Sequence, residues 1–371
     1  VFEDFNAFLE NNGLNKSGYE IAVSIDSSFA KEEFELKVGS VGTVVRVGER
    51  EGLRRAIIKI EDMLVLGGGK LKTGSYHYKY LLERRISRSF FSPINRPPKY
   101  TDELYDGKDY YPHGYLNKLM HDGVNAVWIN TSFRALIRSP YITEFGEGSE
   151  KRIKKLKRTA ERCALYGIEV FLFLIEPISL YEPEVQSAYP GIYKKYPQVS
   201  GNNGGGPIAF CTYSEFGEKY LADSAERLFK QLPEIAGIIS ITHGERVTSC
   251  ANTWGDIYGN WYNNCPYCKD KSASQIVAHT VDIFVKSMKK VSPKAEFISW
   301  TYGHRGKPFG VIEEYVEKVP DNAILMQNFE DDGRVLQLGK KRFALDYYLC
   351  YAGPSDMFGF TARQAALHDK K

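Results

Sequence analysis

The motif His243-Gly244-Glu245-Arg246 follows an apolar segment, Gly-Ile-Ile-Ser-Ile-Thr, and carries side chains suited to acid–base chemistry. A carboxyl next to apolar walls has a raised pKa, so Glu245 could act as a general acid near neutral pH. Cleavage of a glycosidic bond needs such an acid on the leaving oxygen. His243 could orient Glu245 or contact a sugar hydroxyl, or it could be a structural histidine. The alternative for Glu245 is an ion pair with Arg246 or a lysine.

A second catalytic group must come from another carboxylate or from the substrate. Retaining glycosidases place the second carboxylate about 5–5.5 Å from the first, and inverting ones about 6.5–9.5 Å. The candidates that follow other apolar segments are Glu176, Glu330, Asp331 and Asp332. A substrate's own acetamide can also be the nucleophile. We take Glu330 as the candidate partner of Glu245, and the alternatives remain open.

Further polar and aromatic residues lie in or after the apolar segments and could bind a carbohydrate. Sugar hydroxyls need many hydrogen-bond donors and acceptors, and sugar C–H faces stack on aromatic rings. The candidate sugar contacts are Arg88, Asn130, Glu176, Trp300, Tyr302, His304, Asn328 and Asp331. For Trp300, which lies inside an apolar segment, packing in the core is an equal alternative.

Four of the six cysteines could form a structural zinc site. Cys265-Pro-Tyr-Cys268 is a Cys-x-x-Cys pair, Cys250 lies fifteen residues before it, and Cys211 follows an earlier apolar segment. Tetrahedral structural zinc uses four such thiolates. Free thiols, a disulfide and a redox pair are the alternatives. We expect no cofactor for catalysis. The glycine cluster at 201–206 predicts a flexible loop rather than a phosphate-binding one.

The scaffold for these residues is predicted to be a parallel sheet covered by helices. Near-continuous apolar segments alternate with amphipathic helical patterns from residue 81 to residue 371. The predicted strands span residues 85–91, 125–130, 169–175, 237–242, 296–300 and 323–328. Six such units favour a (β/α)8 TIM barrel, in which working residues project from the C-terminal ends of strands. Because the sequence ends soon after the sixth unit, we expect this chain to be a fragment in which two strand–helix units are absent or are supplied by a companion chain or a second copy.

Residues 1–80 predict a small α/β domain in front of the barrel. Segments 20–25, 33–38 and 43–47 alternate between apolar and polar residues, as half-buried strands do. Residues 52–66 have helical spacing, and Gly67-Gly68-Gly69 ends that helix. This unit is too small to hold an active site of its own.

Composition excludes several classes of partner. The 371 residues carry a net charge of +3, which is too small to indicate nucleic acid or a membrane surface. The basic run at 151–158 falls on the outer face of an amphipathic helix. No segment reaches the ~20 apolar residues that span a bilayer, and no secretory signal begins the sequence, although its first residue is Val. We therefore expect a cytoplasmic protein that binds a glycoside and neither nucleic acid nor a membrane.

Several stretches resemble family 20 β-hexosaminidases, and the domain order also resembles family 67 α-glucuronidases. Segments 19–25, 34–38 and 52–64 resemble the small α/β domain that precedes the barrel in these families. Arg85-Ile-Ser-Arg-Ser-Phe90 resembles the first barrel strand of the hexosaminidases, whose arginine binds the innermost sugar, so Arg88 or Arg85 would match it. Ile239-Ser-Ile-Thr-His-Gly-Glu245 resembles their fourth strand, whose closing glutamate is the general acid.

One departure from the hexosaminidase pattern concerns the substrate. Those enzymes carry an aspartate immediately before the acid to hold the acetamide, and Gly244 occupies that position here. Residues 265–272 also resemble bacterial barrel proteins allied to glycosidases, which implies a divergent branch. The resemblance implies a bacterial glycoside hydrolase that acts on a hexosamine-like sugar, with a uronic-acid-specific glycosidase as the alternative. A non-catalytic carbohydrate-binding barrel and a metal-dependent hydrolase using His243 with cysteines are the rival classes.

Overall fold

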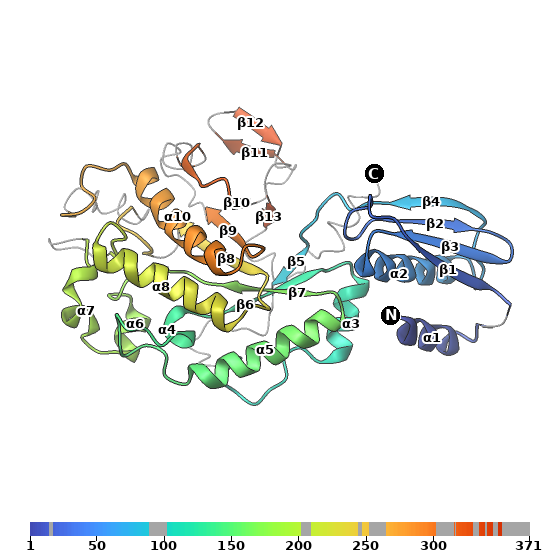
Figure 1. Cartoon of the computed structure of the whole chain (residues 1–371), viewed down its shortest axis with the longest axis horizontal. Coiled ribbons are helices and arrows are strands. Elements are labelled where there is room, and N and C mark those ends of the chain that lie inside the picture. The colour runs from blue at the N-terminus through green and yellow to red at the C-terminus, as the bar shows by residue number, and fades with distance from the viewer. Residues whose placement is uncertain are drawn as a thin grey trace.

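The computed structural model describes residues 1–14, 18–88, 102–201, 209–243, 247–251, 265–301, 315, 317–328, 334–337, 340–343 and 348–350. Within these residues the chain forms two β-sheets with helices packed on them, and a separate two-stranded hairpin (Figure 1). None of the helices in the described ranges combines the length and the apolar character that crossing a bilayer requires.

The small sheet comes first in the chain. Its elements are α1 (Phe2–Asn11), β1 (Glu20–Ile25), β2 (Phe34–Val38), β3 (Gly42–Val47), α2 (Arg50–Leu66) and β4 (Gly74–Tyr78). The strand order is β1-β3-β2-β4, with β1 parallel to β3 and the other pairs antiparallel. Alternate strand residues such as Leu36 and Val45 pack with Ile57 and Ile60 of α2 and with Phe5 of α1 in one core.

The large sheet contains seven parallel strands in the order β13-β10-β9-β8-β7-β6-β5. These strands are β5 (Ile86–Arg88), β6 (Ala126–Asn130), β7 (Glu169–Phe173), β8 (Gly237–His243), β9 (Glu296–Thr301), β10 (Ala323–Asn328) and β13 (Tyr348–Cys350). A short antiparallel hairpin of β11 (Arg334–Gln337) and β12 (Lys340–Phe343) lies between the last two in the chain. Neighbouring strands are consecutive along the chain apart from this hairpin, as the predicted barrel requires.

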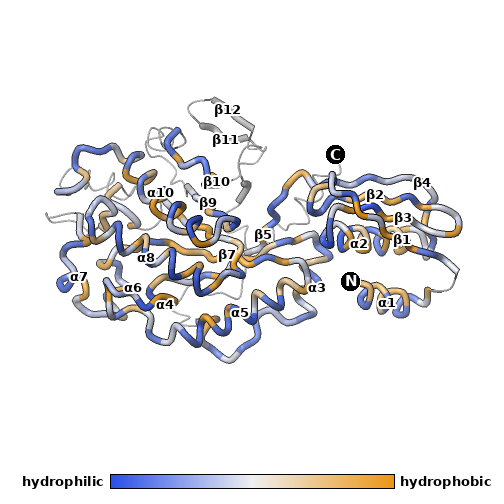
Figure 2. The backbone as a smooth tube through the Cα atoms, viewed as in Figure 1, coloured by the Kyte–Doolittle hydropathy of each residue, from blue (hydrophilic) through white to orange (hydrophobic). Residues whose placement is uncertain are grey.

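Helices connect the strands and cover the outer face of the large sheet (Figure 1). They are α3 (His113–His121), α4 (Phe133–Leu136), α5 (Ser149–Leu165), α6 (Pro183–Ala188), α7 (Ile192–Lys195), the 3-10 turn η1 (Pro197–Val199), α8 (Glu215–Gln231) and α10 (Ala273–Val291). Figure 2 shows hydrophobic residues concentrated on the central strands and polar residues prominent along α5. The pattern of apolar strands and amphipathic helices therefore predicted these layers correctly.

The large sheet is curled, as a barrel wall is. Trp128 of β6 and Trp300 of β9 lie three strands apart, which is about 14 Å in a flat sheet. Their ring centroids are only 6.0 Å apart, and Phe173 of β7 lies 4.8 Å from Trp128. These rings belong to a core on the inner face, distinct from the core between the sheet and its helices. The predicted fold class, a (β/α)8-type barrel following a small α/β unit, is confirmed.

Two expectations about chain organisation remain predictions. β4 ends at Tyr78 and β5 begins at Ile86, on either side of the predicted domain boundary at residue 80. The seventh strand, β13, adds to the six predicted ones and pairs with β10 through Met326 and Tyr348. The proposed completion of the barrel by another chain is not tested by the described residues.

A buried charge network joins the small unit to the large sheet. Glu32, in the loop before β2, accepts hydrogen bonds from Arg55 (2.7 Å), Arg85 (2.7 Å) and Asn125 (3.0 Å). Both arginines are buried and also donate to backbone carbonyls near the start of β6, such as that of Gly123. The network lies at the N-terminal ends of β5 and β6, opposite to the end where the predicted site residues lie.

Candidate active site and thiol cluster

The strands of the large sheet bring several predicted site residues to one end of the barrel wall. Arg88, Asn130, His243 and Asn328 are the last residues of β5, β6, β8 and β10, and Glu176 follows β7 by three residues. Because all of these strands are parallel and adjacent, their C-terminal ends meet at a single edge. This is the end at which barrel enzymes carry their working residues.

Part of the predicted site falls outside the described residues. The candidates beyond them are Glu245, Glu330, Tyr302, His304, Asp331 and Asp332. The side chains of Arg88, His243 and Asn328 are also not described, although their backbone positions are. The catalytic and sugar-binding roles of these residues stay predictions.

Arg85 is removed as an alternative to Arg88 for a sugar-binding role. Its guanidinium is buried at the N-terminal end of the strands, where it contacts Glu32, the carbonyl oxygen of Gly123 and the ring of Tyr80. Arg88, three residues later at the C-terminal end of β5, therefore remains the candidate for the predicted sugar contact.

Trp300 is buried in the core on the inner face of the large sheet. It is 3% exposed, and its ring is 6.0 Å from that of Trp128 and 6.2 Å from that of Phe173. Three packed aromatic rings bury a large apolar area. This burial favours the packing alternative for Trp300 and gives the site an apolar base beneath the strand ends.

Glu176 is buried, and each of its two carboxylate oxygens accepts a hydrogen bond. One oxygen accepts a hydrogen bond from the backbone N–H of Phe133 (2.8 Å), and the other accepts one from that of Ile178 (2.9 Å). Burial raises the pKa of Glu176, while these two hydrogen bonds and the charge of Arg134 act in the opposite direction. The carboxylate therefore ties the loop after β6 to the loop after β7, which favours a positioning role over direct contact with a sugar.

The chain is held on both sides of the Gly244–Arg246 segment. Before it, β8 contains a bulge between Ile241 and His243, and the Thr242 hydroxyl lies 2.8 Å from that of Ser299. After it, the Val247 carbonyl oxygen accepts a hydrogen bond from the Ser179 N–H (3.0 Å). The Val247 N–H also donates to Glu182 (3.3 Å). Bulges are frequent next to active sites because they re-aim a side chain.

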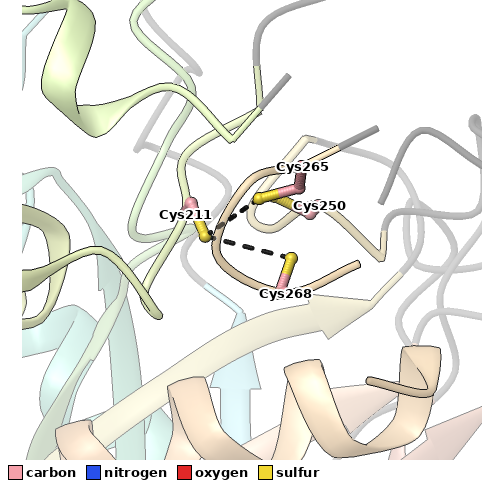
Figure 3. A group of neighbouring side chains, drawn as sticks. All are labelled: Cys211, Cys250, Cys265 and Cys268. Carbon is pink, nitrogen blue, oxygen red and sulfur yellow. Dashed lines mark hydrogen bonds between the residues drawn. The ribbon is translucent and has the colours of Figure 1, made fainter. Parts of the chain in front are cut away.

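The four predicted cysteine ligands come together in one buried cluster (Figure 3). The Sγ atoms of Cys211, Cys250, Cys265 and Cys268 all lie within 4.8 Å of one another, and all four are free thiols. Cys211 Sγ is 3.5 Å from Cys265 Sγ and 3.9 Å from Cys268 Sγ. A tetrahedral site with Zn–S bonds of about 2.3 Å has S···S edges of about 3.8 Å. The cluster therefore has the composition and size of a four-thiolate metal site.

Crowding gives three of the thiols, those of Cys250, Cys265 and Cys268, different acidities. Hydrogen bonds with Cys211, Cys250 and Cys268 hold the pKa of Cys265 below its ordinary value. The pKa values of Cys250 and Cys268 are raised, first by their hydrogen bonds with Cys211. Such a cluster accepts one negative charge readily and further charges only with a cation to compensate them.

Gly201 provides the space for this cluster. A Cβ atom on Gly201 would lie 2.2 Å from Cys250 Sγ and 2.9 Å from Cys265 Sγ, so a larger residue would displace sulfur atoms. Sequence reasoning treated this glycine only as the start of a flexible loop, because nothing in the sequence places it against cysteines distant in the chain. Residues 202–208 of that predicted loop lie outside the described part of the chain.

Comparison with known proteins identifies the fold. No protein-family model matches the chain, and no curated protein matches it. Among solved structures, a GH138 enzyme targeting pectin rhamnogalacturonan II matches with a TM-score of 0.55 and 14% identity over 88% of this chain and 36% of that one. A GH20 exo β-N-acetylglucosaminidase from Vibrio harveyi, in complex with N-acetylglucosamine, matches with a TM-score of 0.51 and 10% identity. That match covers 88% of this chain and 52% of the enzyme.

A further family 20 β-N-acetylglucosaminidase matches with a TM-score of 0.51 and 12% identity over 88% of this chain and 68% of that one. At these identities the likeness concerns the fold. The expected resemblance to family 20 hexosaminidases, and to glycoside hydrolases more generally, is confirmed at that level. The chain spans 36% and 52% of the lengths of the first two structures, which are larger proteins.

Proposed function

We propose that the protein is a glycoside hydrolase that cleaves a terminal glycosidic bond, with a hexosamine-like sugar as its substrate and Glu245 as the general acid. The observation that carries this proposal is the position of Glu245 in the chain. It follows the last residue of β8 by two positions, at the end of the strands where barrel enzymes work. The fold shared with family 20 and GH138 enzymes supports the same reaction class.

In this proposal Glu245 donates a proton to the glycosidic oxygen as the bond to the anomeric carbon breaks. Arg88, Asn130 and Asn328 end neighbouring strands and would contact sugar hydroxyls. The developing positive charge on the sugar would be met by a second carboxylate, for which Glu330 is our candidate, or by the substrate's acetamide. Family 20 enzymes use an aspartate immediately before the acid to hold the acetamide, and Gly244 occupies that position here. We therefore prefer a second carboxylate to the acetamide as the group that assists Glu245.

The test compares Glu245→Gln with the parent on a panel of nitrophenyl glycosides, with Glu218→Gln on the exposed face of α8 as the matched control. We expect Glu245→Gln to lower kcat/KM by about 10²–10⁴-fold, as loss of a general acid does. The loss should be smaller on dinitrophenyl glycosides, because that leaving group departs without protonation. Full activity of Glu245→Gln on every substrate cleaved by the parent would remove the assignment. Sugar binding without turnover by the parent would support the non-catalytic alternative.

For the thiol cluster, we propose that Cys211, Cys250, Cys265 and Cys268 hold one Zn²⁺ in a structural role. Four thiolates and no open coordination position are typical of structural zinc, whereas catalytic zinc keeps a position for water or substrate. Metal analysis of the purified protein should find one equivalent of zinc per chain. Less than half an equivalent, after purification without chelator and with zinc supplied, would contradict the proposal.

A further inference from the structure

The four thiols come from two different strand–helix connections. Cys211 belongs to the connection between β7 and α8, and the other three belong to the connection between β8 and α10. The second connection is also the one that begins with Gly244-Glu245-Arg246. A metal bound by all four sulfurs would therefore cross-link the loop that carries Glu245 to its neighbour.

Three of the four ligands are anchored independently of any metal. The Cys211 carbonyl oxygen accepts a hydrogen bond from the Ser214 hydroxyl (2.7 Å), and Ser214 caps the N-terminus of α8. Cys265 and Cys268 lie in the turn that leads directly to Ser272, which caps α10 through a capping box. The two helices pack side by side on the outer face of the sheet (Figure 1). These sulfur positions thus belong to the rigid frame of the protein.

Cys250 is the candidate ligand that lies nearest to Glu245 in the sequence. It lies five positions after Glu245, at the end of the buried stretch 247–251. Because Cys250 and Glu245 are five positions apart, a bond between Cys250 and the metal would restrain the same connection that carries Glu245. In the described residues the backbone of Val247 is held by Ser179 and Glu182. The Thr248 hydroxyl also donates to the Thr242 carbonyl oxygen (3.3 Å), and a bond from Cys250 to the metal would add a further fixed point.

We infer that the four-thiolate metal site is a positioning device for Glu245: it fixes the loop after β8 through Cys250, and turnover depends on it although the metal does not touch the substrate. This inference rests on the proposed function. It assigns Cys250 a positioning role, and it predicts that the metal acts through the geometry of the loop rather than as a Lewis acid.

The first experiment compares Cys250→Ala with Cys163→Ala, which removes a buried thiol of α5 outside the cluster. Zinc content, hydrogen exchange of the peptide 247–251 and steady-state kinetics are measured on the full chain. We expect Cys250→Ala to retain less than half an equivalent of zinc, to exchange faster in 247–251 than in α5, and to lose at least tenfold in kcat. Cys163→Ala should keep zinc, exchange and kcat. Zinc loss with unchanged exchange in 247–251 or unchanged kcat would overturn the inference.

A double-mutant cycle separates positioning from general destabilisation. If the metal acts through Glu245, Cys250→Ala should cause little further loss in a Glu245→Gln background, because the positioned group is already gone. Multiplicative losses would show that Cys250 acts elsewhere and would overturn the inference. If Glu245→Gln alone keeps full activity, the assignment of Glu245 as the acid fails. If Glu245→Gln is inactive but Cys250→Ala is fully active without zinc, only the positioning role is excluded.

Metal exchange distinguishes positioning from catalysis by the metal. After zinc is stripped from the full chain, Zn²⁺, Co²⁺ and Cd²⁺ are added back separately. All three accept tetrahedral thiolate ligands, so a positioning site predicts kcat values that agree within about threefold. The Co²⁺ form should show the absorption bands of tetrahedral thiolate coordination. Values of kcat that follow the Lewis acidity of the metal would favour the metal-dependent hydrolase and overturn the inference.

Discussion

Replacing Glu32 by glutamine removes the negative charge that joins the small unit to the barrel wall, at almost constant shape. Its carboxylate is the shared acceptor of Arg55, Arg85 and Asn125, and the two guanidiniums are 1% and 0% exposed. Burial alone would raise the pKa of Glu32, but the charges of Arg55 and Arg85 outweigh it and lower the pKa. The ionised carboxylate is therefore the form that the folded protein stabilises.

The expected cost follows from the burial of the partners. Removing one member of a buried ion pair typically lowers the free energy of unfolding by about 3–5 kcal/mol, because a buried charge is left uncompensated. Glu35→Gln is the matched control, since Glu35 pairs with Arg46, whose side chain is 36% exposed. Exposed pairs contribute about 0–1 kcal/mol. Glu35→Gln should therefore destabilise the protein clearly less than Glu32→Gln does.

Urea unfolding at pH 7 followed by two signals provides the measurement. All four tryptophans lie in residues 128–300, so fluorescence reports the barrel part, whereas circular dichroism reports the whole chain. A group with a lowered folded pKa stabilises above its unfolded pKa and loses that contribution as the pH falls. The difference between Glu32→Gln and the parent should therefore shrink below pH 4.5, the ordinary value for glutamate. A loss no larger than that of Glu35→Gln at pH 7 would refute the reasoning.

Three further predictions follow from other titratable groups. Glu176→Gln should lower the free energy of unfolding by about 1–3 kcal/mol in urea titrations, because the new amide NH₂ would face one of the two backbone N–H donors. An unchanged urea midpoint would contradict the two hydrogen bonds to Glu176. The hydrogen bond to Glu61 raises the pKa of His121, so its stabilisation is present below pH 6.5 and lost as the pH rises through the folded value. His121→Gln should therefore cost more stability at pH 6 than at pH 9, and an equal cost at both would refute this. Burial raises the pKa of Cys163 to about 12, so mass spectrometry should find it unmodified by iodoacetamide at pH 8 until urea unfolds the chain, and rapid labelling of the native protein would contradict it.

The fold was predictable to the extent that it follows from local patterning. Apolar runs such as 237–242 and the intervening helical patterns identified the parallel sheet, because buried strands and amphipathic helices have distinct periodicities. β4 (Gly74–Tyr78) was missed, since its sequence Gly-Ser-Tyr-His-Tyr has few aliphatic residues and the strand pairs with only β2. α1 was also missed, although Phe2, Phe5 and Leu9 have helical spacing.

The site was less predictable because its geometry depends on residues distant in the chain. The sequence grouped Cys250 with Cys265 and Cys268 by spacing and added Cys211 from its place after a strand. The role of Glu176 could not be foreseen in the same way. One of its two N–H partners belongs to a residue 43 positions away, and a backbone donor leaves no trace in side-chain types. The choice between Arg85 and Arg88 likewise required knowing which end of β5 faces the small unit.

The Glu32 network lies at the N-terminal ends of β5 and β6, whereas the thiol cluster lies in the connections that follow the C-terminal ends of β7 and β8 in the same sheet. One end joins the chain's two units through buried charge, and the other carries long connections whose composition varies freely in barrel proteins. Because of this separation, many residues of the connections at one end can be changed without affecting the buried charges that stabilise the fold at the other end. A library of altered β7–α8 and β8–α10 connections that keeps the four cysteines, Gly201 and Glu176 should therefore remain folded far more often than a library that varies residues around Glu32.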